Sequence, residues 1–321
     1  MTIKEQIRVI LEQRRGEFVS GEELAKSLYC TRSAVWKAIT ALRKEGCVIT
    51  AATNRGYRMD SGRDVLSEAG IRRWLGEYGS EVIVKASVGS TNALLRELAR
   101  GGAPEGTLAA ASEQTNGSGR RGRRFFSPAD TGLYMSILLR PDFPAWEAVQ
   151  ITSAAAAAVC LALEEVCGVK TEIKWVNDVY VDGKKAAGIL TEAAFGLENG
   201  ALEYAVVGIG VNVYEPVGGF PEELSGIAGA VLSQPQSDIR NRLAAEITKR
   251  FMELYRALPD SGYMDEYRKR LMWTGERIFI LSGSAGTSAV MLGVDESCGL
   301  LVRYDDGTEG VVSSGKISIR R

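Results

Sequence analysis

The segment from Gln114 to Pro128 is the part of the chain whose composition points most clearly to chemistry. It reads QTNGSGRRGRRFFSP and places three glycines and four arginines between Gly117 and Phe126. Glycine lets a backbone approach a ligand closely, and arginine presents a planar fork to phosphate or carboxylate groups. The segment predicts a loop that closes over a phosphorylated ligand. On composition alone, a basic surface loop is an equally good interpretation.

The same segment also matches a nucleotide-binding pattern that does not fit its surroundings. Residues Gly117 to Gly122 have the form G-x-G-x-x-G. In dinucleotide-binding folds this pattern opens a helix, and an acidic residue follows about 20 positions later. Here further arginines and then Ser127-Pro128 follow. We therefore reject a dinucleotide fold.

The absence of one residue type limits the possible chemistry. The chain contains no histidine. Ser-His-Asp catalysis, histidine general bases and the common zinc sites are therefore excluded, and we expect no protein metal site. The five cysteines are odd in number and form no C-x-x-C pair, which indicates reduced structural thiols. Catalysis must rest on lysine, arginine, carboxylates, amides, hydroxyls or the backbone.

Alternating strands and helices surround this loop and must position it. The pattern predicts a mixed sheet backed by helices, because several strands follow one another in hairpins. The expected strands are Val82–Ala86, Thr107–Ser112, Leu133–Arg140, Glu172–Trp175, Val179–Val181, Ala186–Thr191 and Glu203–Val213. The expected helices are Asn92–Arg100, with Ser90 or Thr91 as its cap, Trp146–Cys167 and Asp238–Leu258.

The first sixty residues predict a separate DNA-binding fold. Apolar residues recur at helical spacing in three short segments. Ser20 and Glu23 have the spacing of a capping box, and Thr31 or Ser33 can cap the third helix. Two strand-like runs, Cys47–Ala51 and Gly56–Met59, then form a hairpin. This order is that of a winged helix-turn-helix domain.

The charge distribution supports a polyanionic partner for this domain alone. Residues 1–63 carry 12 basic and 7 acidic side chains, whereas the remainder carries 27 basic and 33 acidic ones. A basic third helix can enter a major groove, and a basic hairpin tip can reach a phosphate. The candidate DNA-binding residues are Arg32, Ser33, Trp36, Lys37, Thr40, Arg43 and Arg55. The alternative is a solvated helix face on which Trp36 simply packs.

The chain divides into three expected domains. Residues 60–64 (DSGRD) are typical of a linker, and from residue 273 short alternating runs predict a small β-barrel. We expect a winged-helix domain at 1–63, a central domain at 64–272 and the barrel at 273–321, an α+β fold overall. The N-terminus is too polar for a signal peptide, and no apolar run approaches the roughly 20 residues of a membrane span, so we expect a cytoplasmic protein.

Several motifs resemble those of biotin–protein ligases that are fused to a biotin-operon repressor domain. The resemblance covers nearly the whole chain, and its central motifs occur in the family's order. Residues Gly21 to Met59 look like the repressor's N-terminal domain, and the loop is similar to the family's G-R-G-R-x-G-R. The other matching segments are Gly89-Ser90-Thr91-Asn92, Lys174-Trp175-Val176-Asn177-Asp178, Lys184 to Leu190, and Gly208-Ile209-Gly210-Val211-Asn212.

The resemblance implies an activity, its substrates and its partners. The expected enzyme, a biotin–[acetyl-CoA-carboxylase] ligase, uses ATP and magnesium to form biotinyl-5'-AMP. It then transfers biotin to a lysine of a biotin carboxyl carrier protein. As a repressor, it would bind operator DNA as an adenylate-linked homodimer, and we expect the strand Glu203–Val213 to be the dimer edge.

The same resemblance assigns roles to individual residues. Lys185 and Arg120 are expected to offset the negative charge during adenylation, and Asp178 to orient or deprotonate the acceptor amine. A turn residue is the alternative role for Asp178. The expected biotin- and adenylate-binding residues are Ser90, Thr91, Asn92, Gln114, Gly117, Ser118, Gly119, Arg120, Arg121, Arg123, Phe125, Asn177, Lys185, Gly188 and Asn212.

Two positions depart from the family pattern. Ser118 stands where an arginine is usual, which removes one ligand-facing charge and puts retention of the adenylate in doubt. Val176 replaces the usual proline before Asn177-Asp178. The alternatives are therefore a catalytically weak repressor that senses biotin, and a lipoate–protein ligase, whose family shares the central architecture.

Overall fold

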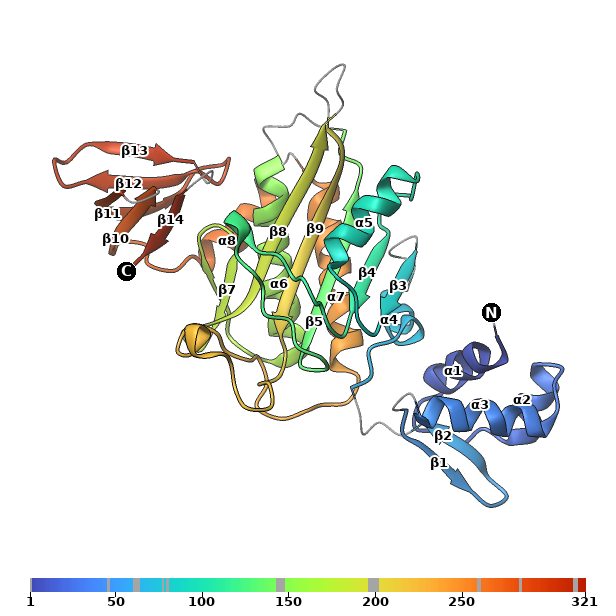
Figure 1. Cartoon of the computed structure of the whole chain (residues 1–321). Helices are drawn as coiled ribbons and strands as arrows, with labels where there is room; N and C mark the ends of the chain where they lie inside the picture. The colour runs from blue at the N-terminus through green and yellow to red at the C-terminus, as the bar shows by residue number, and fades with distance from the viewer. Residues whose placement is uncertain are drawn as a thin grey trace. The chain divides into compact units, whose positions relative to one another are not determined.

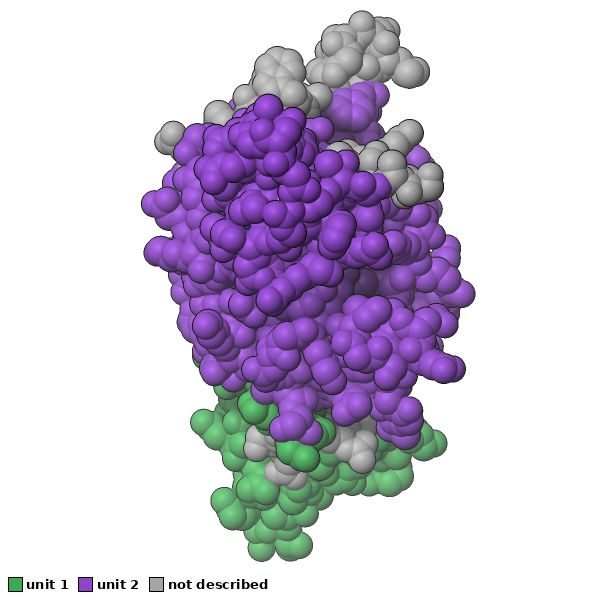
Figure 2. Space-filling view, turned by 90° about the vertical axis from the view of Figure 1, so that its left-hand side faces the viewer, with its two compact units in different colours: residues 1–77, 234–245 green, residues 78–233, 246–321 purple. Residues whose placement is uncertain are grey.

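The computed structural model describes the chain except for residues 1, 45–46, 60–63, 77, 79–80, 143–147, 196–201, 259–260, 283–284 and 314–316. It forms two compact units (Figure 2). Unit 1 comprises Met1–Glu77 and Gln234–Ala245, and unit 2 comprises Tyr78–Ser233 and Glu246–Arg321. Residues 60–63 of the predicted linker and the predicted helix start at Trp146 lie outside the described residues.

Unit 1 contains the predicted winged-helix elements. They are α1 (Ile3–Gln13), α2 (Gly21–Ser27), α3 (Arg32–Lys44), β1 (Ile49–Ala52) and β2 (Gly56–Met59). Ser20 caps α2 by accepting a hydrogen bond from the backbone of Glu23, and Thr31 caps α3 through the backbone of Ala34. Gly56 has a φ of 99°, and a side chain there would meet the Val19 carbonyl at 2.1 Å, so only glycine fits this turn.

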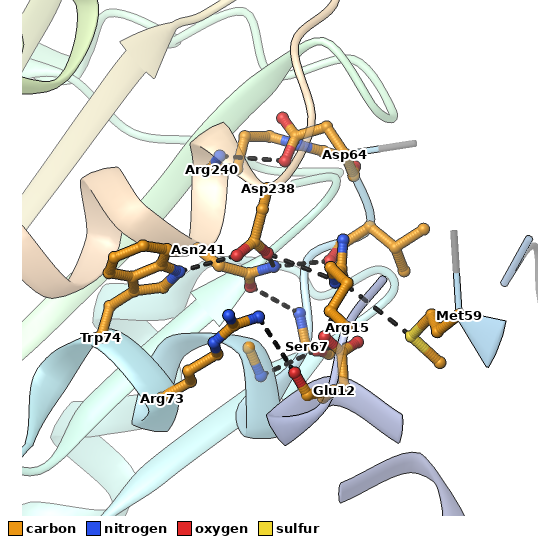
Figure 3. Close-up of polar contacts among 12 residues, drawn as sticks. Glu12, Arg15, Met59, Asp64, Ser67, Arg73, Trp74, Asp238, Arg240 and Asn241 are labelled. Atoms are coloured by element: carbon orange, nitrogen blue, oxygen red, sulfur yellow. Dashed lines mark hydrogen bonds and ion pairs between the residues drawn. The ribbon is translucent and has the colours of Figure 1, made fainter. Parts of the chain in front are cut away.

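A buried polar network joins the winged helix to the rest of unit 1, which holds α4 (Glu68–Leu75) and the first turns of α7 (Ile239–Arg256). Figure 3 shows its members converging from α1, α4, α7 and the residues that flank these helices. Arg15 pairs with Glu12, and Ser67 donates to Glu12 through its hydroxyl and to Asn241 Oδ1 through its backbone at 2.9 Å. Asn241 in turn donates to Asp238 at 2.8 Å. Because buried charges are tolerated only with partners, this network specifies how α1 packs against its neighbours.

A seven-stranded mixed sheet with the order β3-β4-β5-β9-β8-β7-β6 forms the centre of unit 2. Strands β3 and β4 run parallel, and the other neighbours run antiparallel. The bounds are β3 (Val82–Lys85), β4 (Leu108–Ala111), β5 (Gly132–Leu139), β6 (Glu172–Lys174), β7 (Asp178–Val181), β8 (Lys184–Phe195) and β9 (Leu202–Asn212). The predicted strands are confirmed, with β8 longer than expected.

Helices cover both faces of this sheet, and adjacent residues of one strand contact helices on opposite faces. In Figure 1, α5 (Thr91–Arg100) lies in front of the sheet and α6 (Ala148–Cys167) behind it. On β8, Glu192 receives a hydrogen bond from Asn92 of α5, whereas the adjacent Thr191 bonds Thr152 of α6. Successive side chains of a strand point to opposite faces, so the residues in step with Glu192 share the α5 face.

Helix α6 corrects the expectation that no apolar run approaches the length of a membrane span. The segment Val149–Cys167 is long and apolar enough to cross a membrane by length and composition. Within the protein it is a core helix: 67% of its most apolar stretch is buried, and Ala154 to Cys160 are fully buried.

The C-terminal region forms an open sheet, so the predicted closed barrel is not confirmed. Five antiparallel strands have the order β13-β12-β11-β10-β14. They are β10 (Arg277–Ser282), β11 (Ala285–Val294), β12 (Leu300–Tyr304), β13 (Glu309–Val312) and β14 (Ile317–Arg320). Among the described residues, β13 and β14 are edge strands that do not pair with each other.

The sheet order also shows that one prediction was wrong. The strand expected to be a free dimer edge, Glu203–Val213, corresponds to β9, which is hydrogen-bonded to β5 on one side and to β8 on the other. Its backbone groups are already paired, so it cannot add a partner strand. Helix α4, helix α8 (Met264–Lys269) and strand β14 were not predicted from the sequence.

Candidate active site

A cavity of about 510 Å³ lies on the α5 face of the central sheet. Its lining combines the start of α5, the arginine-rich loop of residues 114–128 (the arginine loop), β7, β8 and β9, the segment from Phe220 to Ala228, and residues of β10 and β14. Of the predicted ligand-binding and catalytic residues, it includes Ser90, Thr91, Asn92, Gln114, Ser118, Gly119, Arg120, Arg121, Arg123, Phe125, Asn177, Asp178, Lys185, Gly188 and Asn212. The fold therefore gathers residues that are up to about 120 positions apart in the chain.

Glycines form the floor of the cavity. Gly188 of β8 and Gly210 of β9 face each other in register, and the Phe125 ring lies over both. A Cβ atom at Gly210 would come within 2.5 Å of the Phe125 ring, and one at Gly188 within 3.3 Å. At Gly208, a Cβ atom would meet the amide of Asn92 at 2.3 Å. Any side chain at these positions would displace the groups that shape the cavity.

The arginine loop is a short hairpin-like structure in the described chain. The backbone of Phe125 donates to Gly117 at 2.9 Å, and that of Gly119 donates to Arg123 at 2.7 Å. A 3₁₀ turn, η1 (Arg120–Gly122), forms its tip, and Arg121 adopts a φ of 63°. Gly117 itself does not line the cavity; it lies where a Cβ would clash with the Phe125 carbonyl at 2.6 Å. The role of Gly117 is therefore to let the two sides of the loop lie close to each other.

Arg120 and Asn177 connect this loop to the sheet. Arg120 Nη1 donates to Asn177 Oδ1 at 2.9 Å, and Asn177 Nδ2 donates to the Ile189 carbonyl at 2.9 Å. Burial, followed by the neighbouring charge of Arg121, lowers the pKa of Arg120, while Asp178 opposes this effect. Arginine nevertheless keeps its charge in proteins, so Arg120 brings a positive, oriented fork to the cavity.

Lys185 and Asp178 form an ion pair across neighbouring strands. Lys185 Nζ lies 2.6 Å from Asp178 Oδ1, and both side chains are about three-quarters buried, with exposures of 28% and 23%. Asn212 donates to the Lys185 carbonyl at 3.4 Å. Among the described lining residues the carboxylates are Asp178 and Glu223, whereas lysines and arginines are numerous. The cavity is therefore suited to an anionic ligand.

A chain of hydrogen bonds fixes the polar end near α5. Ser90 caps this helix, and both the backbone and the hydroxyl of Thr91 donate to Gln114 Oε1, at 2.9 and 3.1 Å. Ser136 Oγ lies within hydrogen-bond distance of both Thr91 Oγ1, at 2.7 Å, and Asn92 Oδ1, at 2.6 Å. These side chains are preorganised, so a polar ligand group meets donors and acceptors that are already held in place.

Several lining residues were missed from the sequence. Burial lowers the pKa of Lys174, and burial together with Asp178 raises the pKa of Tyr180 to about 12. Lys174 belongs to the quoted K-W-V-N-D segment, so that motif was a signal for it. No sequence signal identified the segment 220–228 or the C-terminal residues Leu281, Ile319 and Arg320, which tertiary packing brings to the cavity.

The predicted DNA-binding residues of α3 differ in how their side chains are engaged. Trp36 is 58% exposed, so it does not simply pack in the core, and Lys37 is exposed beside it. Arg32 pairs with Glu22 at 2.9 Å. The Arg43 guanidinium donates two hydrogen bonds to the Ile49 carbonyl, which ties α3 to β1. Arg43 thus has a structural task that the sequence did not reveal.

The remaining predicted DNA-binding residues lie in α3 and at the hairpin. Ser33 is hydrogen-bonded to Thr31 at 2.9 Å, and Thr40 donates to the Trp36 carbonyl at 2.9 Å. Arg55, next to the hairpin turn, stacks on the Phe18 ring with its guanidinium carbon 4.3 Å from the centroid. This contact holds a cation at the tip of the wing.

Comparisons with known proteins agree with this geometry. Residues 84–212 match the model of the biotin/lipoate A/B protein ligase family, and residues 4–58 match an HTH domain. The bifunctional ligase/repressor BirA of Bacillus subtilis is 36% identical, with 98% of each chain covered, and that of Escherichia coli is 27% identical, with 98% of this chain and 97% of the relative covered.

A solved structure resembles three quarters of the chain. The biotin protein ligase from Aquifex aeolicus, in complex with biotin and ATP, is 28% identical with a TM-score of 0.63, and the match covers 75% of this chain and 99% of that one. The identity over the full length of the Bacillus protein decides the assignment. The chain belongs to the family of bifunctional ligase/repressor BirA proteins.

Proposed function

We propose that the protein joins biotin to ATP as biotinyl-5'-AMP, transfers biotin to a lysine of a biotin carboxyl carrier protein, and represses biotin genes through its winged-helix domain. The observation that carries the ligase activity is the cavity. It places Arg120, Lys185 and Asp178 around one space that also contains a preorganised polar end and a glycine floor. Biotin requires this combination, since it has a polar ureido group, an apolar body and a carboxylate.

Adenylation brings two negative groups together. The biotin carboxylate attacks the α-phosphate of ATP, and pyrophosphate leaves. Lys185 and Arg120 would offset the repulsion between the reactants and stabilise the charge that develops in the transition state. The protein need not supply a nucleophile, because the substrate carboxylate is the nucleophile. A chain without histidine can therefore catalyse this step.

The mixed anhydride product must be kept from water. The arginine loop lines the cavity together with Phe125 and Phe126 and can cover the acyl phosphate. Phe126 packs edge-on against Phe220, with ring centroids 6.5 Å apart, so the loop has a partner in the segment between β9 and α7. Closure of this lid retains the intermediate until the acceptor arrives.

Transfer requires an uncharged acceptor amine. We assign Asp178 the task of orienting the amine and accepting its proton, since its carboxylate is the one closest to Lys185 in the cavity. Arg120 would remain on the phosphate as AMP leaves. The ion pair between Lys185 and Asp178 thus connects the groups proposed for the two half-reactions.

Magnesium is proposed as a companion of ATP. Among the described residues, no group of three or more His, Cys, Asp or Glu side chains could hold a metal ion alone. Magnesium usually needs only one or two carboxylates besides the phosphates, and Glu223, which has no proposed part in the transfer step, lines the cavity. The residues present therefore fit this ion, which would neutralise part of the phosphate charge.

The regulatory part of the proposal concerns DNA and assembly. We propose the boundaries 1–63, 64–272 and 273–321 for the three domains, a cytoplasmic location, and an adenylate-linked homodimer on a palindromic operator. Strand β9 is excluded as the dimer edge because both its sides are paired. Sedimentation with and without biotin and ATP tests the dimer, since an unchanged mass would exclude ligand-linked assembly.

Competition between acyl substrates tests the ligase assignment. Labelled biotin with ATP and magnesium should give a protein-bound adenylate that excess lipoate does not displace. Preferential formation of a lipoyl-adenylate would instead place the protein with the lipoate ligases. Failure in a single-turnover biotinylation assay would favour a sensor without catalysis. The structure retains Arg120 and Lys185 at the cavity despite Ser118, which supports catalysis.

A further inference from the structure

The turn that carries the catalytic side chains is held from beneath by groups outside the cavity. Residues 175–177 form the turn between β6 and β7, and Asn177 and Asp178 project from it. Trp175 and Val176 are buried, with exposures of 5% and 2%. The polar atoms of this turn need partners, since a buried carbonyl without a partner is strongly disfavoured.

Helix α8 supplies one of these groups. The hydroxyl of Tyr267 donates to the Val176 carbonyl at 3.1 Å, and the Tyr267 side chain is fully buried. Burial holds the pKa of Tyr267 well above its ordinary value, so the hydroxyl keeps the proton that it donates. The Val176 carbonyl belongs to the peptide group that leads into Asn177. Fixing the plane of this peptide fixes the direction in which the Asn177 side chain leaves the backbone.

The C-terminal sheet supplies the second group. The indole nitrogen of Trp175 donates to the carbonyl of Cys298, in the turn between β11 and β12, at 2.9 Å. Helix α8 holds that same turn, because Arg268 donates to Glu296 at 2.7 Å and to the Val294 carbonyl at 3.4 Å. In Figure 1, α8 lies between β7 and the five-stranded sheet.

These contacts hold the turn that carries Asn177, the residue that orients Arg120. Asn177 receives the Arg120 hydrogen bond on Oδ1 and binds the Ile189 carbonyl through Nδ2. A rotation of the turn would break both contacts and move the Asn177 acceptor away from the Arg120 guanidinium. We propose that Tyr267 and Trp175 are positioning residues for Asn177, through which α8 and the C-terminal sheet set the geometry of adenylation. This inference rests on the proposed function.

The variant Tyr267→Phe tests the inference, because it removes only the hydroxyl. In the full-length chain with biotin, ATP, magnesium and a biotin carrier domain, we expect the kcat for pyrophosphate release to fall roughly tenfold, since small misplacements of reacting groups are costly. The KM for biotin should change by less than about twofold, because the polar end near α5 is untouched. An unchanged kcat in a folded variant would overturn the inference.

Tyr263→Phe is the matched control. Tyr263 lies in the turn η4 (Ser261–Tyr263) before α8, is 3% exposed, and shares a hydrogen bond of 2.8 Å with Ser153 of α6 rather than with the catalytic turn. Both variants should lower the Tm by a similar amount, but Tyr263→Phe should leave kcat within about twofold of the wild type. Equal kcat losses in the two variants would indicate a general effect of stability and contradict the inference.

A double-mutant cycle separates positioning from packing. If Tyr267 acts through Asn177, the loss caused by Tyr267→Phe should shrink to less than about twofold in an Asn177→Ala background. Independent, multiplying losses would contradict the inference. Should Tyr267→Phe fail to fold, Trp175→Phe in the same cycle tests the second anchor. Inactive wild-type protein would overturn the proposed function and the inference with it, whereas active wild type beside a fully active Tyr267→Phe would overturn the inference alone.

Discussion

Lys185 Nζ lies 2.6 Å from Asp178 Oδ1, and both side chains line the cavity that also contains Arg120. In the proposed function, an incoming phosphate would compete with Asp178 for the lysine ammonium. If Lys185 turned toward the phosphate, the Asp178 carboxylate would become available to the acceptor amine. One ion pair can therefore order the two half-reactions, with adenylation preceding transfer.

Lys185→Ala should impair adenylation first. The variant removes a cation that acts on developing phosphate charge, so pyrophosphate release should slow by about 10²–10³-fold. Lys184→Ala is the matched control, because Lys184 is the exposed neighbour in the same strand and does not line the cavity. Normal pyrophosphate release by Lys185→Ala would remove this residue from its proposed role.

Asp178→Asn should slow transfer while adenylation proceeds. The amide keeps the shape of the side chain but cannot accept the acceptor's proton, and general-base groups contribute about 10²–10⁴-fold. Pre-formed adenylate and a carrier domain, mixed in a single turnover, measure transfer separately. Asp182→Asn serves as the control, since Asp182 is exposed in the turn that follows β7 and asparagine tolerates its φ of 49°. Equal slowing of both half-reactions by Asp178→Asn would contradict the division of labour.

Gly210→Ala should weaken biotin binding. The new methyl group would lie 2.5 Å from the Phe125 ring and must push it off the floor of the cavity. We expect biotin affinity to fall at least about tenfold, as for other overpacked sites. Calorimetric titration with biotin measures the change. Gly262→Ala, where no atom lies within 4 Å of the added carbon, should bind biotin normally. Wild-type affinity in Gly210→Ala would show that Phe125 does not shape the biotin site.

Lys37→Ala should weaken operator binding and its dependence on salt. Lys37 is exposed on α3 beside Trp36, where a phosphate contact would reduce the slope of log affinity against log salt by about one when removed. Lys26→Ala is the control, because this exposed lysine of α2 pairs with Glu22. Titrations at several salt concentrations distinguish the two variants, and an unchanged slope for Lys37→Ala would argue against a phosphate contact there.

The sequence predicted local structure and motif residues well because these depend on short-range patterns. Ser20, Thr31 and Ser90 cap the helices as their spacing suggested, and the loop and strand motifs meet at one cavity. The alternation of apolar and polar residues along a strand does not determine which strands pair with one another. The prediction that β9 is an edge strand was therefore wrong, because β9 lies between β5 and β8 in the central sheet. The C-terminal sheet is open, which leaves the predicted barrel unconfirmed.

Other features depended on contacts between distant segments. Arg43 has the charge and spacing of a DNA-binding residue, yet its guanidinium is bound to the Ile49 carbonyl. Tyr267 reaches Val176 across 91 positions, so no local pattern marks it. The acidic and basic members of the network around Arg15 and Asn241 likewise come together only in the folded unit (Figure 3).

A single-turnover experiment separates adenylate formation from transfer to the carrier. Purified full-length protein receives labelled biotin, ATP and magnesium, first without and then with a biotin carrier domain. We expect release of pyrophosphate and retention of about one biotinyl-adenylate per chain, followed by movement of the label to the carrier's lysine. Protein that releases no pyrophosphate and retains no adenylate would contradict it.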